Sequence, residues 1–215
     1  FDGPALDAAK WTPEIGFLRN KESQYYTDRK ENVSVENGCL VLEGRKETFP
    51  NAKYDPAKTN DWRCAKAAQY TSGSVATRHK YTFTYGRIEV RAKLPKGRGV
   101  WPAIWTIGSA AYDAPAHPYP KCGEIDIMEH VGHEPPNIYA TAHWWNPKKP
   151  NGLESVGMYT NWAWHDVHAP SPANGFHTYA LEWDEEKLEF FFDGHPYHRV
   201  DVARDRRSAT AVFPY

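Results

Sequence analysis

Residues 122–132 read Cys-Gly-Glu-Ile-Asp-Ile-Met-Glu-His-Val-Gly. Three carboxylates, Glu124, Asp126 and Glu129, alternate with apolar residues here, and this alternation predicts a β-strand. Successive side chains of a strand point to opposite faces, so Glu124 and Asp126 share one face and the isoleucines lie on the other. Glu129 is five positions after Glu124, which would place it on the apolar face of a regular strand. One extra residue at 127–128, a β-bulge, would return it to the acidic face, so we predict a bulge there.

The spacing of the two glutamates suits chemistry on a sugar. Four effective strand steps place their backbones about 13 Å apart, and side chains that lean inward would bring the carboxylates to around 5–6 Å. Retaining glycosidases use about this separation, with one carboxylate as nucleophile and the other as proton donor and acceptor. Asp126 lies between them, and its charge would raise the proton affinity of its neighbours and favour a protonated Glu129.

Two other interpretations of this acidic strand are open. It could be a solvated charged face, or it could hold a divalent cation, since carboxylate oxygens suit calcium. Nine Trp, thirteen Tyr and nine Phe in a chain of mean hydropathy −0.74 favour a carbohydrate site. Sugar rings present flat C–H faces that stack on aromatic rings, and an indole adds an N–H donor.

Composition limits the remaining classes of function. The chain has 215 residues, a net charge of −1 and a pI near 6.9, with no basic stripe that would suit a nucleic-acid backbone. No apolar run approaches the roughly 18 residues of a membrane span. The three cysteines allow at most one disulfide and match no zinc pattern, so we expect free buried thiols.

Many short strands separated by turn signals predict an all-β fold, a sandwich or jelly roll. Asn37-Gly38 predicts a hairpin turn, and 49–63, 108–121 and 146–175 read as irregular loops. The expected strands cover residues 33–36, 39–46, 74–78, 81–85, 87–94, 100–107, 139–145, 176–183, 187–192 and 197–202, besides the acidic strand.

The motif Gly-Glu-Ile-Asp-Ile-Met-Glu at 123–129 resembles the catalytic signature of glycoside hydrolase family 16, in the bulged spacing of its laminarinase, agarase and carrageenase branches. Five further stretches resemble laminarinases in the same order along nearly the whole chain. They are Asn20–Val33, Tyr70–Ser74, Tyr85–Pro95, Val100–Trp105, and Phe176–Trp183 with Phe192–Gly194.

The resemblance implies a β-jelly-roll sandwich of two antiparallel sheets with an open concave cleft. It implies Glu124 as nucleophile, Glu129 as acid/base and Asp126 as the assisting carboxylate of an endo-acting, retaining enzyme. Substrate-binding residues are expected around this triad. They are Asn20, Arg78, Trp101, Trp105, His143 and Trp145. Of these, Trp101 and Trp105 are expected to stack on minus-side sugars. For Trp101, Trp105, Arg78 and His143, a purely structural role is the alternative.

We expect one catalytic domain over 1–215 that lacks the C-terminal strands of the family, acting as a secreted monomer on a β-glucan, with no nucleic-acid or membrane partner. No cofactor is expected to be required. Some family members bind a structural calcium partly through the distal strand, which makes calcium a weak expectation here. An endo-β-1,3-glucanase is the first hypothesis. The alternatives are a hydrolase of marine galactans (agar, porphyran or carrageenan) and a non-catalytic β-glucan-binding protein, although proteins of that last kind typically lose the acidic residues.

Overall fold

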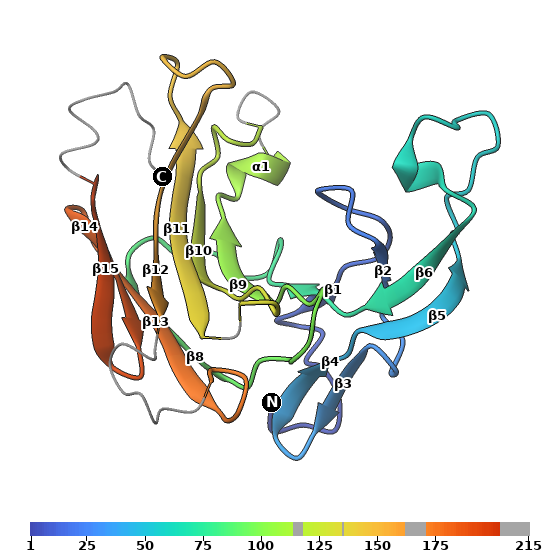
Figure 1. The fold of residues 1–215 in the computed structure, drawn as a ribbon, viewed down its shortest axis with the longest axis horizontal. Helices are drawn as coiled ribbons and strands as arrows, with labels where there is room; N and C mark the ends of the chain where they lie inside the picture. The colour runs from blue at the N-terminus through green and yellow to red at the C-terminus, as the bar shows by residue number, and fades with distance from the viewer. Residues whose placement is uncertain (114–117, 135, 162–170, 203–215) are drawn as a thin grey trace. The chain divides into compact units, whose positions relative to one another are not determined.

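The computed structural model describes residues 1–113, 118–134, 136–161 and 171–202, and the chain forms two compact units, Phe1–Thr82 and Phe83–Tyr215. Strands dominate both units, as the sequence predicted (Figure 1). In the second unit the described elements are β8 (Gly86–Ala92), β9 (Ala103–Ile107), the short helix α1 (Ala110–Asp113), β10 (Glu124–Glu129), β11 (Asn137–Trp145), β12 (Leu153–Asn161), β13 (His177–Trp183), β14 (Lys187–Phe192) and β15 (His195–Asp201).

The second unit is a sandwich of two four-stranded antiparallel sheets. One sheet has the order β12-β11-β10-β9 and the other has the order β15-β14-β13-β8. Ile125 and Ile127 of β10 pack in one buried cluster with Leu181 of β13 and Phe190 of β14. This cluster draws on both sheets, so the apolar face of β10 lies in the interior of the sandwich.

The first unit contains three smaller sheets. Its strands are β1 (Thr12–Pro13), β2 (Gln24–Tyr26), β3 (Val33–Glu36), β4 (Cys39–Leu42), β5 (Arg45–Pro50), β6 (Ala67–Ser72) and β7 (Val75–Ala76), with a 3-10 helix at Trp62–Cys64. The predicted turn joins β3 to β4, and Asn37 and Gly38 both have positive φ, of 52° and 75°. Two such residues are what a type I′ hairpin turn requires. One pair, β2 with β6, is parallel rather than antiparallel.

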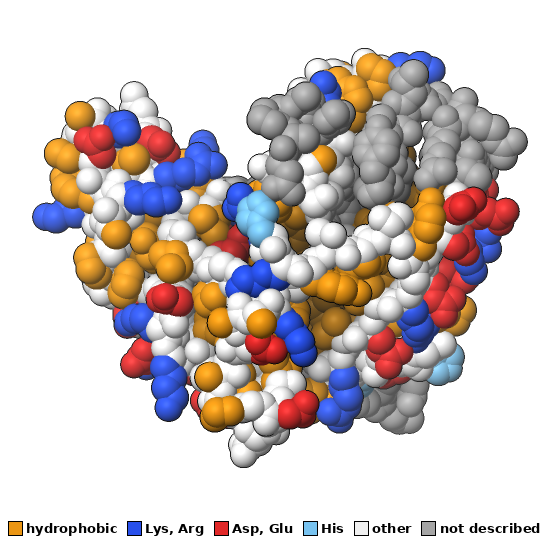
Figure 2. Space-filling view, turned by 180° about the vertical axis from the view of Figure 1, so that it is seen from behind, with side chains coloured by type: hydrophobic (Ala, Val, Ile, Leu, Met, Phe, Trp, Pro, Cys, Tyr) orange, Lys and Arg blue, Asp and Glu red, His pale blue; other side chains and the backbone are white. Residues whose placement is uncertain are grey.

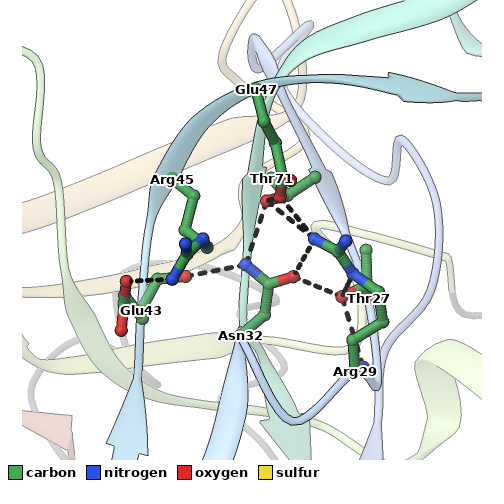
Figure 3. Close-up of polar contacts among 7 residues, drawn as sticks. All are labelled: Thr27, Arg29, Asn32, Glu43, Arg45, Glu47 and Thr71. Carbon is green, nitrogen blue, oxygen red and sulfur yellow. Dashed lines mark hydrogen bonds and ion pairs between the residues drawn. The ribbon is translucent and has the colours of Figure 1, made fainter.

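A buried polar network centred on Asn32 joins segments of the first unit (Figure 3). Asn32 is 1% exposed, and its amide nitrogen donates to the Glu43 carbonyl at 2.9 Å and to the Thr71 hydroxyl at 3.0 Å. Its amide oxygen accepts from Arg29 and from Thr27. Each polar atom of this buried amide therefore has a partner, which removes the cost of burying it.

Several strand predictions were wrong. The strands β2 and β6 were not predicted, and the strand expected over 39–46 is divided between β4 and β5. Residues 81–85 form no strand, because Tyr85 has φ of +66°, which breaks the extended backbone just before β8. Conversely, β12 lies in a stretch that was read as irregular. A Cβ at Gly157 would lie 2.7 Å from the Thr141 hydroxyl on β11, so this glycine marks a close approach between strands rather than a loop.

Acidic and basic side chains are interspersed over the surface seen in Figure 2. Among the described residues, no helix is long and apolar enough to cross a lipid bilayer. Cys39, Cys64 and Cys122 are all free thiols, as expected, but only Cys122 is buried, and Cys39 and Cys64 are half-buried.

Candidate active site

The predicted β-bulge is present in β10. Against β9, the register passes from Asp126 opposite Trp105 to Met128 opposite Ile104, so Ile127 is the extra residue. Against β11, three steps along β10 correspond to two steps along its partner. Ile127 and Met128, consecutive in sequence, are 2% and 1% exposed. The bulge thus lets two neighbouring apolar residues face the interior while the following residue, Glu129, returns to the other side.

The pairing with β11 shows which face each carboxylate occupies. Along Asn137–Trp145 burial alternates strictly, with the odd-numbered residues half-buried and the even-numbered residues buried. Glu124, Asp126 and Glu129 lie opposite His143, Thr141 and Tyr139, all of which are odd-numbered. Because directly opposite residues of an antiparallel pair share a face, the three carboxylates lie on one face. We call this the acidic face.

Glu129 receives a hydrogen bond from a tryptophan on the acidic face. The indole Nε1 of Trp101, a residue that is 64% exposed, donates to Glu129 Oε1 at 2.9 Å. Burial and the negative charge of Asp126 raise the pKa of Glu129, while the Trp101 hydrogen bond and His143 oppose the rise. A raised pKa is the property that lets a carboxylic acid donate a proton near neutral pH.

Asp126 is held by His143 from the neighbouring strand. His143 Nε2 lies 3.0 Å from Asp126 Oδ2, and its Nδ1 lies 2.6 Å from the Ser155 hydroxyl on β12. Burial of the ring opposes its charge, but the bond to Asp126 and the nearby carboxylates raise the pKa of His143. His143 was predicted to bind substrate, and its position makes it also an orienting partner of Asp126.

A cation could bind on part of the acidic face. Glu124, Asp126 and His143 each offer a ligand atom, and these atoms lie within 4.8 Å of one another. Calcium prefers six to eight oxygen ligands, so two carboxylates and an imidazole suit it poorly. The same three groups are also the hydrogen-bonded and charged groups of a metal-free acid–base site.

Two other predicted tryptophans also lie on this face. Trp105 of β9 is opposite Asp126 and half-buried. Trp145 is an odd-numbered residue of β11, and a Cβ at Gly152 would lie 1.6 Å from its ring, so the indole packs directly on that glycine. The Lys121 ammonium is 5.3 Å from the centre of the same ring. Trp145 is therefore packed between neighbours, which limits its use as an open stacking surface.

Asn20 and Arg78 belong to the first unit, and both are exposed. Asn20 has a positive φ of 53° in a turn, and Arg78 Nε lies 3.0 Å from the ring of His79. Their part in substrate binding stays a prediction.

Sequence reasoning missed two neighbours of the carboxylates. Tyr119 lies close enough to the acids that burial, followed by the charges of Glu124 and Asp126, raises its pKa to about 12. The sequence feature that could have indicated Tyr119 is its position in Pro-Tyr-Pro, only five residues before Glu124. Ser155 was missed because β12 was read as a loop, and only the pairing of β11 with β12 places it against His143.

A sequence model of glycosyl hydrolases family 16 matches residues 20–215. A β-glucanase from Rhodothermus marinus is 36% identical over 208 residues, which are 95% of this chain and 64% of that protein. The chain thus spans less than two thirds of this relative's length.

Solved structures match the fold. The laminarinase catalytic domain of Thermotoga maritima MSB8 is 35% identical, with a TM-score of 0.77 over 96% of this chain and 76% of that one. A structure described with endo-acting O-glycanases of human gut bacteria that initiate mucin breakdown is 37% identical, with a TM-score of 0.80 over 94% of this chain and 69% of that one. These matches confirm the all-β jelly-roll prediction.

Proposed function

The chain belongs to glycosyl hydrolases family 16, and from that membership we propose that it is an endo-acting, retaining hydrolase of laminarin-type β-glucans. It cleaves internal β-1,3-glucosidic bonds of these polymers. The observation that carries the proposal is the register of β10, which places Glu124, Asp126 and Glu129 on one face despite their odd spacing. The relative named as a β-glucanase supports the substrate class.

The chemistry follows from the two glutamates. The Glu124 carboxylate attacks the anomeric carbon and forms a glycosyl ester, while the Glu129 carboxylic acid gives its proton to the departing glycosidic oxygen. Glu129, now a carboxylate, then removes a proton from water, whose oxygen attacks the same carbon and releases Glu124. Two displacements at one carbon retain its configuration, and Glu129 ends protonated as it began.

Asp126 and His143 support this cycle electrostatically. The charge of Asp126, kept in place by His143 at 3.0 Å, favours the protonated form of Glu129 before the first displacement. The Trp101 indole fixes the Glu129 oxygen that it contacts.

Replacing Glu124 with Gln tests the proposal. We expect the release of reducing ends from laminarin to fall at least about a thousandfold, because the nucleophile is removed. Retardation in a laminarin-containing gel should remain, since the shape of the site is preserved. The matched control is Glu189→Gln, on β14 of the sheet β15-β14-β13-β8, which we call the outer sheet, and it should retain full turnover. Unchanged turnover in Glu124→Gln would refute the assignment of the nucleophile.

A mucin O-glycan is the second candidate substrate, because the structure described with endo-acting O-glycanases and mucin breakdown is as similar to this chain as the laminarinase is. Hydrolysis of laminarin, lichenan, agarose, porphyran and mucin O-glycans should be compared under one condition. Highest kcat/KM on laminarin is the expected result. Binding of laminarin by the wild-type protein with no product from any polymer would instead indicate a glucan-binding protein.

The protein is further proposed to act as a secreted monomer with no required cofactor. Full laminarin hydrolysis after dialysis against a chelator, and an intact monomer mass in solution, are the expected observations.

A further inference from the structure

Two tyrosines continue the line of Glu129 across the acidic face. Glu129 lies opposite Tyr139 of β11, and Tyr139 lies opposite Tyr159 of β12. Directly opposite residues share a face, so both rings are on the side of the three carboxylates. Since neighbouring strands are about 4.8 Å apart, the rings follow Glu129 at one and two strand spacings. We call Tyr139 and Tyr159 the tyrosine platform.

The platform combines an exposed ring with a ring fixed by hydrogen bonding. The two ring centroids are 5.8 Å apart, with planes at 44°, and Tyr159 is 48% exposed. The Tyr139 hydroxyl donates to Glu134, which also accepts from the Asn137 amide at 3.0 Å. These bonds hold the pKa of Glu134 below its usual range, so a charged acceptor stands beside the rings.

We infer that the tyrosine platform binds the sugar units on the leaving-group side of the cleaved bond, an inference that rests on the proposed function. Trp105 on β9 lies on the opposite side of β10, where the minus-side sugars are expected. A glucan that crosses the strands from Trp105 over the carboxylates then reaches β11 and β12. There the tyrosine rings offer flat faces for sugar C–H groups, and Glu134 accepts hydrogen bonds from sugar hydroxyls.

The neighbouring residue in β12 provides a matched control. Met158 lies opposite Ala140, a buried even-numbered residue of β11, so its side chain is on the other face of the strand. Met158 is 51% exposed, close to the value for Tyr159. Met158→Ala therefore tests the effect of shortening a side chain of β12 without changing the platform.

The experiment compares Tyr159→Ala, Tyr159→Phe and Met158→Ala with the wild-type protein on two substrates. Laminarihexaose can place sugars on both sides of the cleaved bond, whereas β-laminaribiosyl fluoride has sugars only on the glycone side. We expect Tyr159→Ala to lose about tenfold in kcat/KM on laminarihexaose, the order that one stacking contact carries. On the fluoride it should stay within about twofold of wild type, and both other variants should match wild type on both substrates.

An equal loss on both substrates, or no loss on laminarihexaose, would overturn the platform while leaving the proposed function standing. A wild-type protein that turns over neither substrate would overturn the proposed function, and the platform with it.

Discussion

The two sheets of the second unit both carry carboxylates on the face away from the sandwich interior, but these carboxylates have different hydrogen-bonding and ion-pair partners on the two sheets. On the sheet β15-β14-β13-β8, Glu89 and Glu182 bind Arg87 at 2.6 and 2.8 Å, and Glu189 binds Lys187 at 2.6 Å. On the acidic face, Glu129 is held by an indole N–H and Asp126 by a histidine. The alternation of residues along a strand therefore predicts the face on which a carboxylate lies. The partners and the burial of that carboxylate decide whether it is a solvated charge or a reactive group.

The surroundings of Glu129 also change its proton affinity. Its pKa is raised, because the group is partly buried and faces the charge of Asp126. Such an environment provides an acid that can give up its proton and take it back near neutral pH.

Removing the acid should give the largest effect. Glu129→Gln is expected to lower kcat/KM on laminarin by about 10²–10⁴-fold, the usual contribution of general acid–base catalysis. Formation of the glycosyl-enzyme from β-laminaribiosyl fluoride should be much less affected, because fluoride leaves without a proton. Sodium azide should restore turnover, because it attacks the intermediate without a base. Glu182→Gln should change neither rate, and an equal loss in the two glutamate variants would erase the contrast between the sheets.

Removing the indole hydrogen bond should give an intermediate effect. The Trp101 N–H stabilises the charged form of Glu129, so Trp101→Phe should raise the pKa of this acid further. Because the acid must be protonated, activity is lost as pH rises through its pKa, and the alkaline limb of the kcat/KM profile should move to higher pH. Measurement of both limbs on β-glucan checks this. A shift to lower pH would contradict the assigned role of the hydrogen bond.

The smallest effect is expected on the outer sheet. Glu182→Gln breaks the contact with Arg87 at 2.8 Å, and exposed ion pairs contribute about 0.2–1 kcal/mol to the free energy of unfolding. Urea titration should therefore show a loss below about 1 kcal/mol, with full laminarin hydrolysis. A larger loss of unfolding free energy would mean that the ion pairs of the outer sheet contribute more to stability than solvated surface charges do.

The acidic strand was predictable from sequence because its chemistry is local. The odd spacing of Glu124 and Glu129 requires a bulge if both face the same side, and the buried pair at 127–128 provides it. The hairpin at Asn37-Gly38 followed from two residues that tolerate positive φ.

What sequence could not supply depends on pairing between distant segments. Gly152, immediately before β12, and Gly157 within it locally resemble loop residues, but the Trp145 ring and Thr141 of β11 leave no room for a side chain at these two positions. Without β12, neither Ser155 behind His143 nor Tyr159 beside Tyr139 could be placed. The hydrogen bond from Trp101 to Glu129 likewise needs the register of β9.

Trapping the covalent intermediate tests the central claim most directly. The wild-type protein should be treated with 2-deoxy-2-fluoro-β-laminaribiosyl fluoride, which slows the second displacement, then digested and sequenced by mass spectrometry. We predict one added disaccharide on Glu124 and none on Glu129. A label on Glu129, or no label on a protein that hydrolyses laminarin, would contradict the double displacement by these two residues.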